Sequence, residues 1–232
     1  VVGFSKSNLA KVAAKAAAGT SLVGISYGAA TTDLKSYNPN FVSVAAPWTR
    51  QWDALHAEIG ASSCTPAQTM VVYHSKDAYS SLFKDGAQQA GYPDIYDLES
   101  QDVKARFVSL VRKKKCLFLA MTIASSQDLL SQVFEAKWRG KVFGTGDWYY
   151  HSLEIKKTLA KIEPPRAQII VPTGWDPMAT PNSTKFAGDM KRKFDQEPDP
   201  SNAYSYDAVQ LALHWLCSGL DPRSFEKEKI SK

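Results

Sequence analysis

The stretch SLVGISYGAATTDL, residues 21–34, begins with the composition of a buried strand and continues as a polar loop. Its first part, LVGI, is apolar and partly β-branched, which is typical of a strand buried on both faces. Its second part, from Ser26 to Thr32, consists largely of small and hydroxylated residues. A parallel strand that opens into such a loop presents N–H groups and hydroxyls at its carboxyl end, where open α/β sheets bind ligands. The stretch therefore predicts a strand of a parallel sheet, followed directly by a candidate binding loop.

Strand and helix patterns alternate along almost the whole chain. An alanine-rich helix is predicted before this stretch, over residues 8–18, and it ends at Gly19, a common C-terminal signal. Further strands are predicted at 41–45, 69–73, 116–121, 141–143 and 168–171, and further helices at 49–59, 78–90, 102–113, 126–138, 183–194 and 201–217. Such alternation predicts an α/β protein with parallel sheets.

The composition and charge exclude several classes of partner. Of the 232 residues, 44% are hydrophobic and 22% charged, which is ordinary for a globular protein. The net charge is +5, but basic residues are interspersed with acidic ones, and the densest run, residues 112–115, ends a predicted helix, where positive charge is favourable. No apolar run approaches ~18 residues, and no His, Cys or Asp cluster has the spacing of metal ligands. We therefore expect no nucleic-acid partner, no membrane span, no metal and no cofactor.

The three cysteines do not indicate a disulfide framework. Cys64, Cys116 and Cys217 are too few and too scattered, and none forms a C-x-x-C pair. Cys116 and Cys217 lie in apolar runs, so both are expected to be buried free thiols. The sequence leaves the redox compartment open.

One alternative for the loop is catalytic. The residues Gly24 to Gly28 match G-x-S-x-G, the nucleophile elbow of α/β-hydrolases, with Ser26 as the nucleophile. That motif requires a helix directly after the turn, whereas AATTDLKSYNPN leaves room for about two turns before Asn38-Pro39. A triad would also need a downstream histidine, for which His151 and His214 are the candidates. A serine hydrolase is therefore an alternative function.

The other interpretation rests on a resemblance. VVGFSKSNLAKVAAKAAAGTSLVGISYGAATTDL resembles the first-lobe segment of type I periplasmic binding proteins, the leucine/isoleucine/valine-binding family of ABC-transporter substrate-binding proteins. TMVVYHSKDAYSSLFKDGAQQAG and KVFGTGDWYYHSLEI are similar to that family's second lobe, and FAGDMKRKFDQEPDPSNAYSYDAVQLALHWL follows its pattern most specifically. The resemblance implies a two-lobed fold of parallel sheets flanked by helices. Lobe one would comprise residues 1–63 and 197–232, incompletely, and lobe two residues 64–196. In the family further elements precede Val1 and follow Lys232, so the chain is expected to be partial at both ends and to lack its signal peptide.

The same resemblance implies a ligand site between the lobes. Ser7 and the Ala29 N–H would donate to a ligand carboxylate, although Ser7 is also a candidate helix N-cap. Ala30 stands where the family has a threonine, and Thr31 is expected to compensate. Tyr79 and Asp147 would contact the ligand from lobe two, with Asp147 facing its ammonium. The remaining candidates are Ser26 in the loop and two tryptophans. Trp48 either stacks on the ligand or lies at an exposed helix start, and Trp148 is either a cleft wall or core packing.

The resemblance implies an extracytoplasmic solute-binding protein, not an enzyme. It would capture an amino acid or similar small carboxylate in the inter-lobe cleft, close by a hinge motion and deliver the ligand to an ABC permease. It is expected to be a periplasmic or extracellular monomer. A ligand-sensing receptor ectodomain of the same fold, coupled to a signalling domain, is an alternative that the N-x-T sequon at Asn182 keeps open. A further alternative is a relative of the family that has lost its ligand-binding site.

Overall fold

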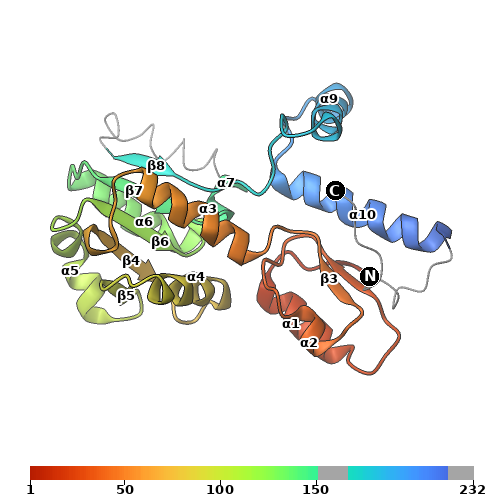
Figure 1. The fold of residues 1–232 in the computed structure, drawn as a ribbon, viewed down its shortest axis with the longest axis horizontal. Coiled ribbons are helices and arrows are strands. Elements are labelled where there is room, and N and C mark those ends of the chain that lie inside the picture. Colours follow the sequence, from red (N-terminus) through yellow and green to blue (C-terminus); the bar gives the residue numbers. More distant parts are fainter. Residues whose placement is uncertain (151–166, 219–232) are drawn as a thin grey trace. The chain divides into compact units, whose positions relative to one another are not determined.

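A computed structural model describes residues 1–150 and 167–218 (Figure 1). The chain divides into two compact units. Unit 1 comprises Val1–Pro47 and Trp175–Lys232, and unit 2 comprises Trp48–Gly174. The predicted α/β class is confirmed, because every strand pairing in both units is parallel.

Unit 1 is built on a three-stranded sheet in the order β1-β2-β3. Its elements are β1 (Val2–Gly3), α1 (Ser7–Ala16), β2 (Gly24–Ser26), α2 (Leu34–Tyr37), β3 (Phe41–Ser43), α9 (Pro181–Phe194) and α10 (Pro200–Ser218). In the register of the sheet, Ile25 of β2 pairs with Val2 of β1 and with Val42 of β3.

Helices cover both faces of the unit 1 sheet. On one face α1 buries a stripe of small side chains, because Ala10, Ala14 and Ala17 recur at helical spacing. These alanines pack against Phe41 of β3 and against Leu34 at the start of α2. On the other face α10 packs against β1 and β2, where Ala208 and Trp215 form a buried cluster with Ile25 and Val42.

Unit 2 is built on a five-stranded sheet in the order β5-β4-β6-β7-β8. Its elements are α3 (Trp48–Ala61), η1 (Pro66–Gln68), β4 (Thr69–Tyr73), α4 (Ala78–Gln89), β5 (Ile95–Asp97), α5 (Gln101–Val111), β6 (Cys116–Ala120), α6 (Ile123–Glu135), β7 (Lys141–Gly144), α7 (Asp147–Tyr150) and β8 (Gln168–Ile170).

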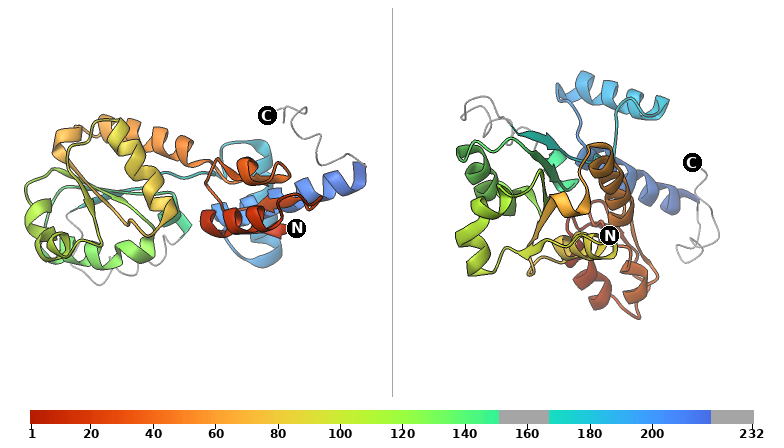
Figure 2. Two further views of the ribbon diagram at one scale, coloured as in Figure 1. Left: turned by 90° about the horizontal axis from the view of Figure 1, so that it is seen from below. Right: turned by 60° about the vertical axis from the view of Figure 1, so that its left-hand side comes forward.

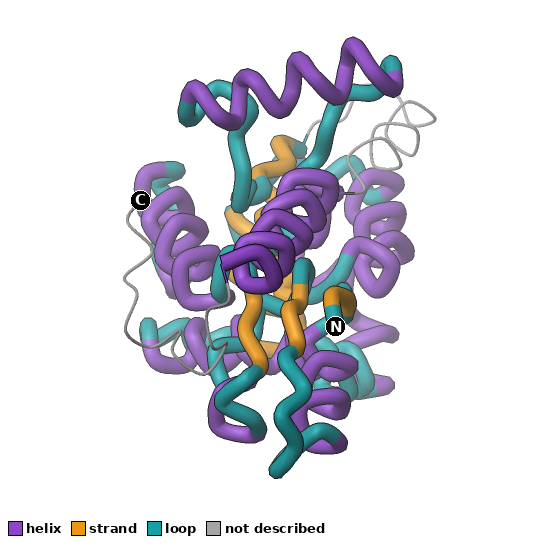
Figure 3. Tube along the Cα trace, turned by 90° about the vertical axis from the view of Figure 1, so that its right-hand side faces the viewer, coloured by secondary structure: helices purple, strands orange, loops and turns teal. Residues whose placement is uncertain are grey.

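The unit 2 sheet lies between two helical layers. Successive side chains of a strand point to opposite faces of the sheet, so alternate residues pack against each layer. Met70 and Val72 of β4 belong to the cluster that contains Phe107 of α5 and Val133 of α6. Val71, between them, belongs to the cluster that α3 and α4 form on the other face. Both central strands are buried on both faces, as the uninterrupted apolar runs TMVVY and CLFLA predict. The left view of Figure 2 shows the unit 2 strands between these helices, and Figure 3 colours the strands of both units orange and the helices purple.

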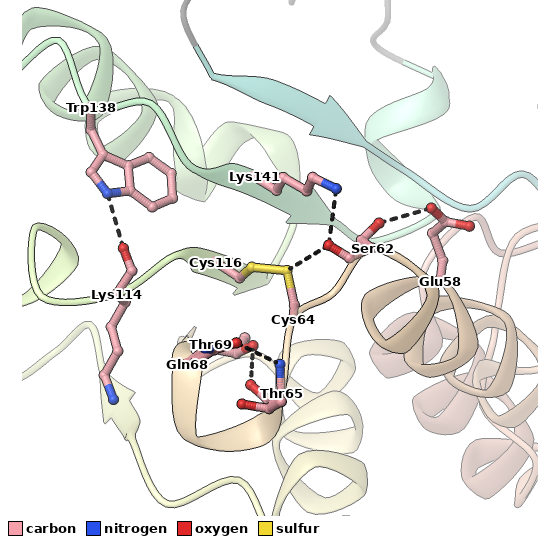
Figure 4. The surroundings of a disulfide bond; sticks show 10 residues. All are labelled: Glu58, Ser62, Cys64, Thr65, Gln68, Thr69, Lys114, Cys116, Trp138 and Lys141. Carbon is pink, nitrogen blue, oxygen red and sulfur yellow. Dashed lines mark hydrogen bonds between the residues drawn. A yellow bond between two sulfur atoms is a disulfide. The ribbon is translucent and has the colours of Figure 1, made fainter.

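A disulfide joins Cys64 to Cys116, so the expectation of a buried free thiol at Cys116 is wrong (Figure 4). Cys116 is the first residue of β6, and Cys64 follows the end of α3, so the bond fixes that helix end to the amino edge of the sheet. The loop around it is also held by Lys141, whose Nζ donates to the Ser62 carbonyl (3.0 Å). Cys217 is free, as expected, but it is exposed rather than buried.

Helix α3 belongs to unit 2, whereas the sequence placed residues 48–63 in lobe one and residues 175–196 in lobe two. The physical reason is packing: Trp52, Leu55 and Ile59 recur on one face of α3 and are buried in the same cluster as Phe118 of β6. In the other direction, Phe186 of α9 packs against Trp175 and Tyr206, which are both in unit 1.

Candidate ligand-binding site

In unit 1 a buried hydroxyl ties together the loops that follow β1 and β2. Ser26 ends β2 and is 1% exposed. Its hydroxyl donates to the Phe4 carbonyl (2.6 Å) and accepts from the Ala29 N–H (2.9 Å). Phe4 has a φ of 66°, a left-handed conformation that costs a non-glycine residue of order 1–2 kcal/mol. The Ala29 N–H, which the resemblance assigns to a ligand carboxylate, is therefore already bonded within the loop.

The Thr31 hydroxyl is also used within unit 1. It donates to the Asp33 carboxylate, which additionally forms an ion pair with Lys11 (2.9 Å). Burial alone would raise the pKa of Asp33, but the hydrogen bonds from Thr31 and Lys11 hold it below its usual value. Ala30 has no hydroxyl to offer a ligand, and Thr31 can donate its own hydroxyl instead only if the hydrogen bond from Thr31 to Asp33 breaks.

Ser7 is the first residue of α1, and Lys6 rather than Ser7 occupies the N-cap, so the N-cap prediction is wrong. Ser7 is 6% exposed. Within residues 1–150 and 167–218 its hydroxyl makes no hydrogen bond, whereas the neighbouring Leu9 N–H donates to the Asn8 side chain. Ser7 thus retains the donor that the resemblance assigns to a carboxylate, at a helix N-terminus where anions are favoured.

Gly28 is required by the close approach of the two unit 1 loops. A Cβ at this position would lie 2.5 Å from the Ser5 carbonyl oxygen, so we expect Gly28→Ala to lower the free energy of unfolding by about 2 kcal/mol. Urea unfolding measures the loss. The matched control is Gly188→Ala on α9, where a Cβ meets nothing within 4 Å and alanine should be neutral or slightly stabilising. A Gly28→Ala variant as stable as the wild type would contradict this close packing.

The geometry around Ser26 is not that of a nucleophile elbow. No helix occupies residues 27–33, and the next one, α2, begins at Leu34 and has only four residues. The Ser26 hydroxyl donates to a backbone carbonyl and not to an imidazole. His214 is exposed on α10, and His151 lies outside the described residues. In the described part of the chain the hydrolase alternative therefore has neither the turn nor the base that it needs.

In unit 2, Tyr79 occupies the first turn of α4, near the carboxyl edge of the sheet. The N-cap residue Asp77 accepts from the Tyr79 N–H (3.0 Å), which fixes this end of the helix. The Tyr79 hydroxyl donates to Gln51 Oε1 (2.9 Å). Burial raises the pKa of Tyr79 above its ordinary value, and the nearby charge of Asp147 raises it further. Tyr79 is therefore neutral, and Asp147 lies close to it.

Asp147 is the first residue of α7 and also caps a second helix. Its Oδ2 accepts from the Ile123 N–H (3.0 Å) at the start of α6, where the N-cap residue Thr122 makes no side-chain cap. A carboxylate at this position is favoured by the helix dipole as well as by the hydrogen bond. Asp147 thus has a structural role beside the ligand-binding role predicted for it.

The two candidate tryptophans differ in exposure. Trp148 is 0% exposed, and its Nε1 donates to the Met121 carbonyl (2.8 Å), which also accepts from the Thr145 hydroxyl (3.1 Å). Trp48, the first residue of α3, is partly exposed and packs against the cluster that includes Trp52. Of the two roles that the sequence left open, these contacts favour core packing for Trp148.

Gln51 is the residue at this edge that sequence reasoning missed. It lies between Trp48 and Trp52 on the first turns of α3, and its carboxamide reaches Tyr79 on α4. The available signal was a polar residue placed between two tryptophans at the start of a helix that packs on the sheet. No sequence pattern indicated that α3 and α4 lie side by side.

Residues 1–150 and 167–218 contain no group of three or more His, Cys, Asp or Glu residues placed to hold a metal ion. Likewise, none of the helices in this part of the chain combines the length and the apolarity needed to cross a membrane.

Comparison with known proteins identifies the fold. A substrate-binding protein of an ABC transporter from Desulfitobacterium hafniense, in complex with Leu, superposes with a TM-score of 0.73 at 18% identity and covers 96% of this chain. A branched-chain amino acid transporter substrate-binding protein from Streptococcus pneumoniae, in complex with isoleucine, gives 0.76 at 14% identity and 96% coverage. A solute-binding protein of an ABC transporter from Rhodopseudomonas palustris HaA2, in complex with p-hydroxybenzoic acid, superposes with a TM-score of 0.70 at 13% identity and covers 95% of this chain.

The fold is therefore that of the type I periplasmic binding proteins, as the sequence resemblance predicted. The chain spans 63–65% of the length of these three structures, somewhat less than two thirds. No protein-family model and no curated protein matches the chain. At these identities the likeness shows the fold alone.

Proposed function

We propose that this protein is a non-enzymatic solute-binding protein that captures an amino acid or a similar small carboxylate for ABC-type transport. The observation that carries the proposal is that Asp147 lies close to Tyr79 at the carboxyl edge of the unit 2 sheet. Parallel α/β sheets bind ligands at this edge. The fold supports the proposal, since the neighbours with this fold are solute-binding proteins, reported in complex with Leu, isoleucine and p-hydroxybenzoic acid.

In this proposal each unit contributes a different kind of group. Unit 1 supplies hydrogen-bond donors to the ligand carboxylate from Ser7 and the start of α1. Unit 2 supplies acceptors, the Tyr79 oxygen and the Asp147 carboxylate, to the ammonium or hydroxyl of the ligand. A ligand that contacts both units stabilises the bound conformation, because the ligand has a higher affinity for that conformation than for the free one.

The disulfide supports an extracytoplasmic location for the protein. Such bonds form and persist in oxidising compartments such as the periplasm or the extracellular space, and they are rare in the cytosol. Both cysteines of the pair are buried, at 4% and 2% exposure. A membrane permease of the ABC type is the partner that this location and fold favour, with the protein acting as a monomer.

Ligand capture is tested by a thermal-shift screen with leucine, isoleucine and p-hydroxybenzoate. A ligand present at about a hundred times its dissociation constant stabilises the folded state by roughly 2.7 kcal/mol, which raises the melting temperature visibly. The proposal would be contradicted if the protein melts cooperatively but its melting temperature is unchanged by these compounds and by a wider panel of amino acids and small carboxylates.

Asp147 offers a test that separates its two roles. Asp147→Asn keeps an oxygen that can accept from the Ile123 N–H but removes the charge, so we expect nearly unchanged stability and at least about tenfold weaker binding of leucine. Asp147→Ala removes the cap as well and should cost about 1 kcal/mol of stability. Isothermal titration calorimetry and urea unfolding measure the two effects, with exposed Asp128→Asn on α6 as the control. Wild-type affinity in the Asp147→Asn variant would remove Asp147 from the site.

A further inference from the structure

Three side chains of unit 1 direct hydrogen-bond donors at the carboxylate of Asp33, in the loop between β2 and α2. The Thr31 hydroxyl donates to Asp33 Oδ1. Lys11 Nζ lies 2.9 Å from Asp33 Oδ2, and the Tyr37 hydroxyl lies 3.4 Å from the same oxygen. An ammonium group and hydroxyls around one carboxylate are the charge-assisted contacts with which proteins bind this group. The loop therefore contains a carboxylate site that a carboxylate of the same chain occupies.

This site lies beside the position proposed for the ligand carboxylate. Lys11 comes four residues after Ser7 on α1, so the two side chains lie on the same face of the helix, one turn apart. Thr31 belongs to the loop that follows the carboxyl end of β2, and parallel α/β sheets bind ligands at this edge. Asp33 thus engages the Thr31 hydroxyl next to the α1 face from which Ser7 would bind a ligand.

The Thr31 hydroxyl can serve only one carboxylate at a time. It has a single proton to donate, and Thr31 is 6% exposed, so water cannot readily replace an acceptor there. Asp33 has other partners, because its side chain is 40% exposed and keeps its ion pair with Lys11 when Thr31 turns away. Exchanging Asp33 for a ligand carboxylate therefore replaces one charge-assisted bond to Thr31 by another of the same kind.

The position of α2 does not depend on the bond between Thr31 and Asp33. Asp33 is the N-cap residue of α2, but its side chain makes no cap hydrogen bond. Leu34, the first residue of α2, lies in one buried cluster with Ala14 of α1, and Lys15 Nζ lies 4.6 Å from the centre of the Tyr37 ring. Through these contacts α1 and α2 lie side by side (Figure 1). A substitution of Asp33 is therefore expected to leave the fold of unit 1 intact.

We propose that Asp33 is an internal competitor, which holds the Thr31 hydroxyl away from the ligand and thereby lowers the affinity of the protein for a carboxylate. A ligand whose carboxylate binds at Ser7 gains this second hydroxyl only when it displaces Asp33 from Thr31. The inference rests on the proposed function and deepens it, because it names the residue that limits the affinity and the ligand group that this residue imitates.

The experiment measures binding by isothermal titration calorimetry, with leucine, isoleucine and p-hydroxybenzoate as the probes. In Asp33→Ala the Thr31 hydroxyl loses the acceptor that Asp33 provides, so the probe should bind about tenfold more tightly than it binds the wild type. Asp33→Asn keeps the shape of the side chain and a neutral acceptor, so it should give a smaller gain. The matched control is Asp189→Ala on α9, which makes the same charge change in the same unit, at an acid paired with Arg192. Its affinity should stay within about twofold of the wild-type value, because salt screens charges that are distant from the ligand.

Removing a negative charge also favours an anionic ligand without any hydrogen bond, and Thr31→Val separates the two effects. The gain from Asp33→Ala is measured again in the Thr31→Val background, where it should fall below about twofold. A gain that persists there comes from charge alone and overturns the inference. If the wild type binds a probe and neither Asp33 variant binds it more tightly, the inference is wrong and the proposed function stands. If no probe binds to the wild type or to either Asp33 variant, the proposed function fails and the inference fails with it.

Discussion

Replacing Trp148 by alanine is expected to lower the free energy of unfolding by about 4 kcal/mol. The side chain is 0% exposed and lies in the cluster that joins α5 and α6 to the sheet. It packs directly on Gly144 of β7, where an added Cβ would fall 2.3 Å from the indole ring. Its Nε1 also donates to the Met121 carbonyl, so alanine leaves a cavity and removes one of the two hydrogen bonds to that carbonyl, the other being from the Thr145 hydroxyl.

The loss at Trp148 is best measured by guanidinium unfolding followed by far-UV circular dichroism, because the substitution itself changes the fluorescence. Trp148→Phe keeps most of the apolar volume but loses the hydrogen bond, so its effect should be clearly smaller. A Trp148→Ala variant that unfolds like the wild type but no longer binds leucine would show that the ring faces ligand instead of core.

Removing the disulfide by Cys64→Ala with Cys116→Ala is expected to cost about 4 kcal/mol. The bond links residues 52 positions apart, and the chain-entropy relation for a loop of that length gives a loss of this size. The end of α3 would then be held to the sheet by the packing of Ile59 and by the bond from Lys141 of β7 to the Ser62 carbonyl.

Urea unfolding of the oxidised protein and of the double variant measures this difference, and reduction of the wild type with dithiothreitol should reproduce it. Cys217→Ala is the control, because that thiol is free and exposed and its replacement should change stability by less than about 0.5 kcal/mol. A double variant within about 1 kcal/mol of the wild type would show that α3 is held by packing alone.

Buried strands were predicted well because their signal is local. The apolar run at Thr69–Tyr73 is bounded by polar residues on both sides and forms β4 with the expected limits. Strand β5 was missed because it has only three residues, all of them half-buried, and so shows neither an apolar run nor alternation. Helix α6 begins at Ile123 instead of Ser126, since Asp147, distant in sequence, supplies its cap.

The candidate site was predicted as a set of residues but not as a set of contacts. Tyr79 and Asp147 lie close together because both follow strands of one parallel sheet, β4 and β7, with β6 between them. The bonds that engage Ser26 with Phe4, and Tyr79 with Gln51, join segments more than twenty residues apart. Such pairings, like the disulfide, depend on which surfaces the fold brings together, and one sequence carries no pattern for them.

The division of the chain also sets the order in which its parts can be completed during synthesis. Unit 2 is one continuous stretch, so all of its described strands and both helical layers exist once residue 174 has emerged from the ribosome. The sheet of unit 1 is made first, but its second face stays uncovered until Ala208 and Trp215 of α10 have been made. Residues 1–47 therefore gain their full core only after unit 2 has been made, and their strands stay exposed on one face until then.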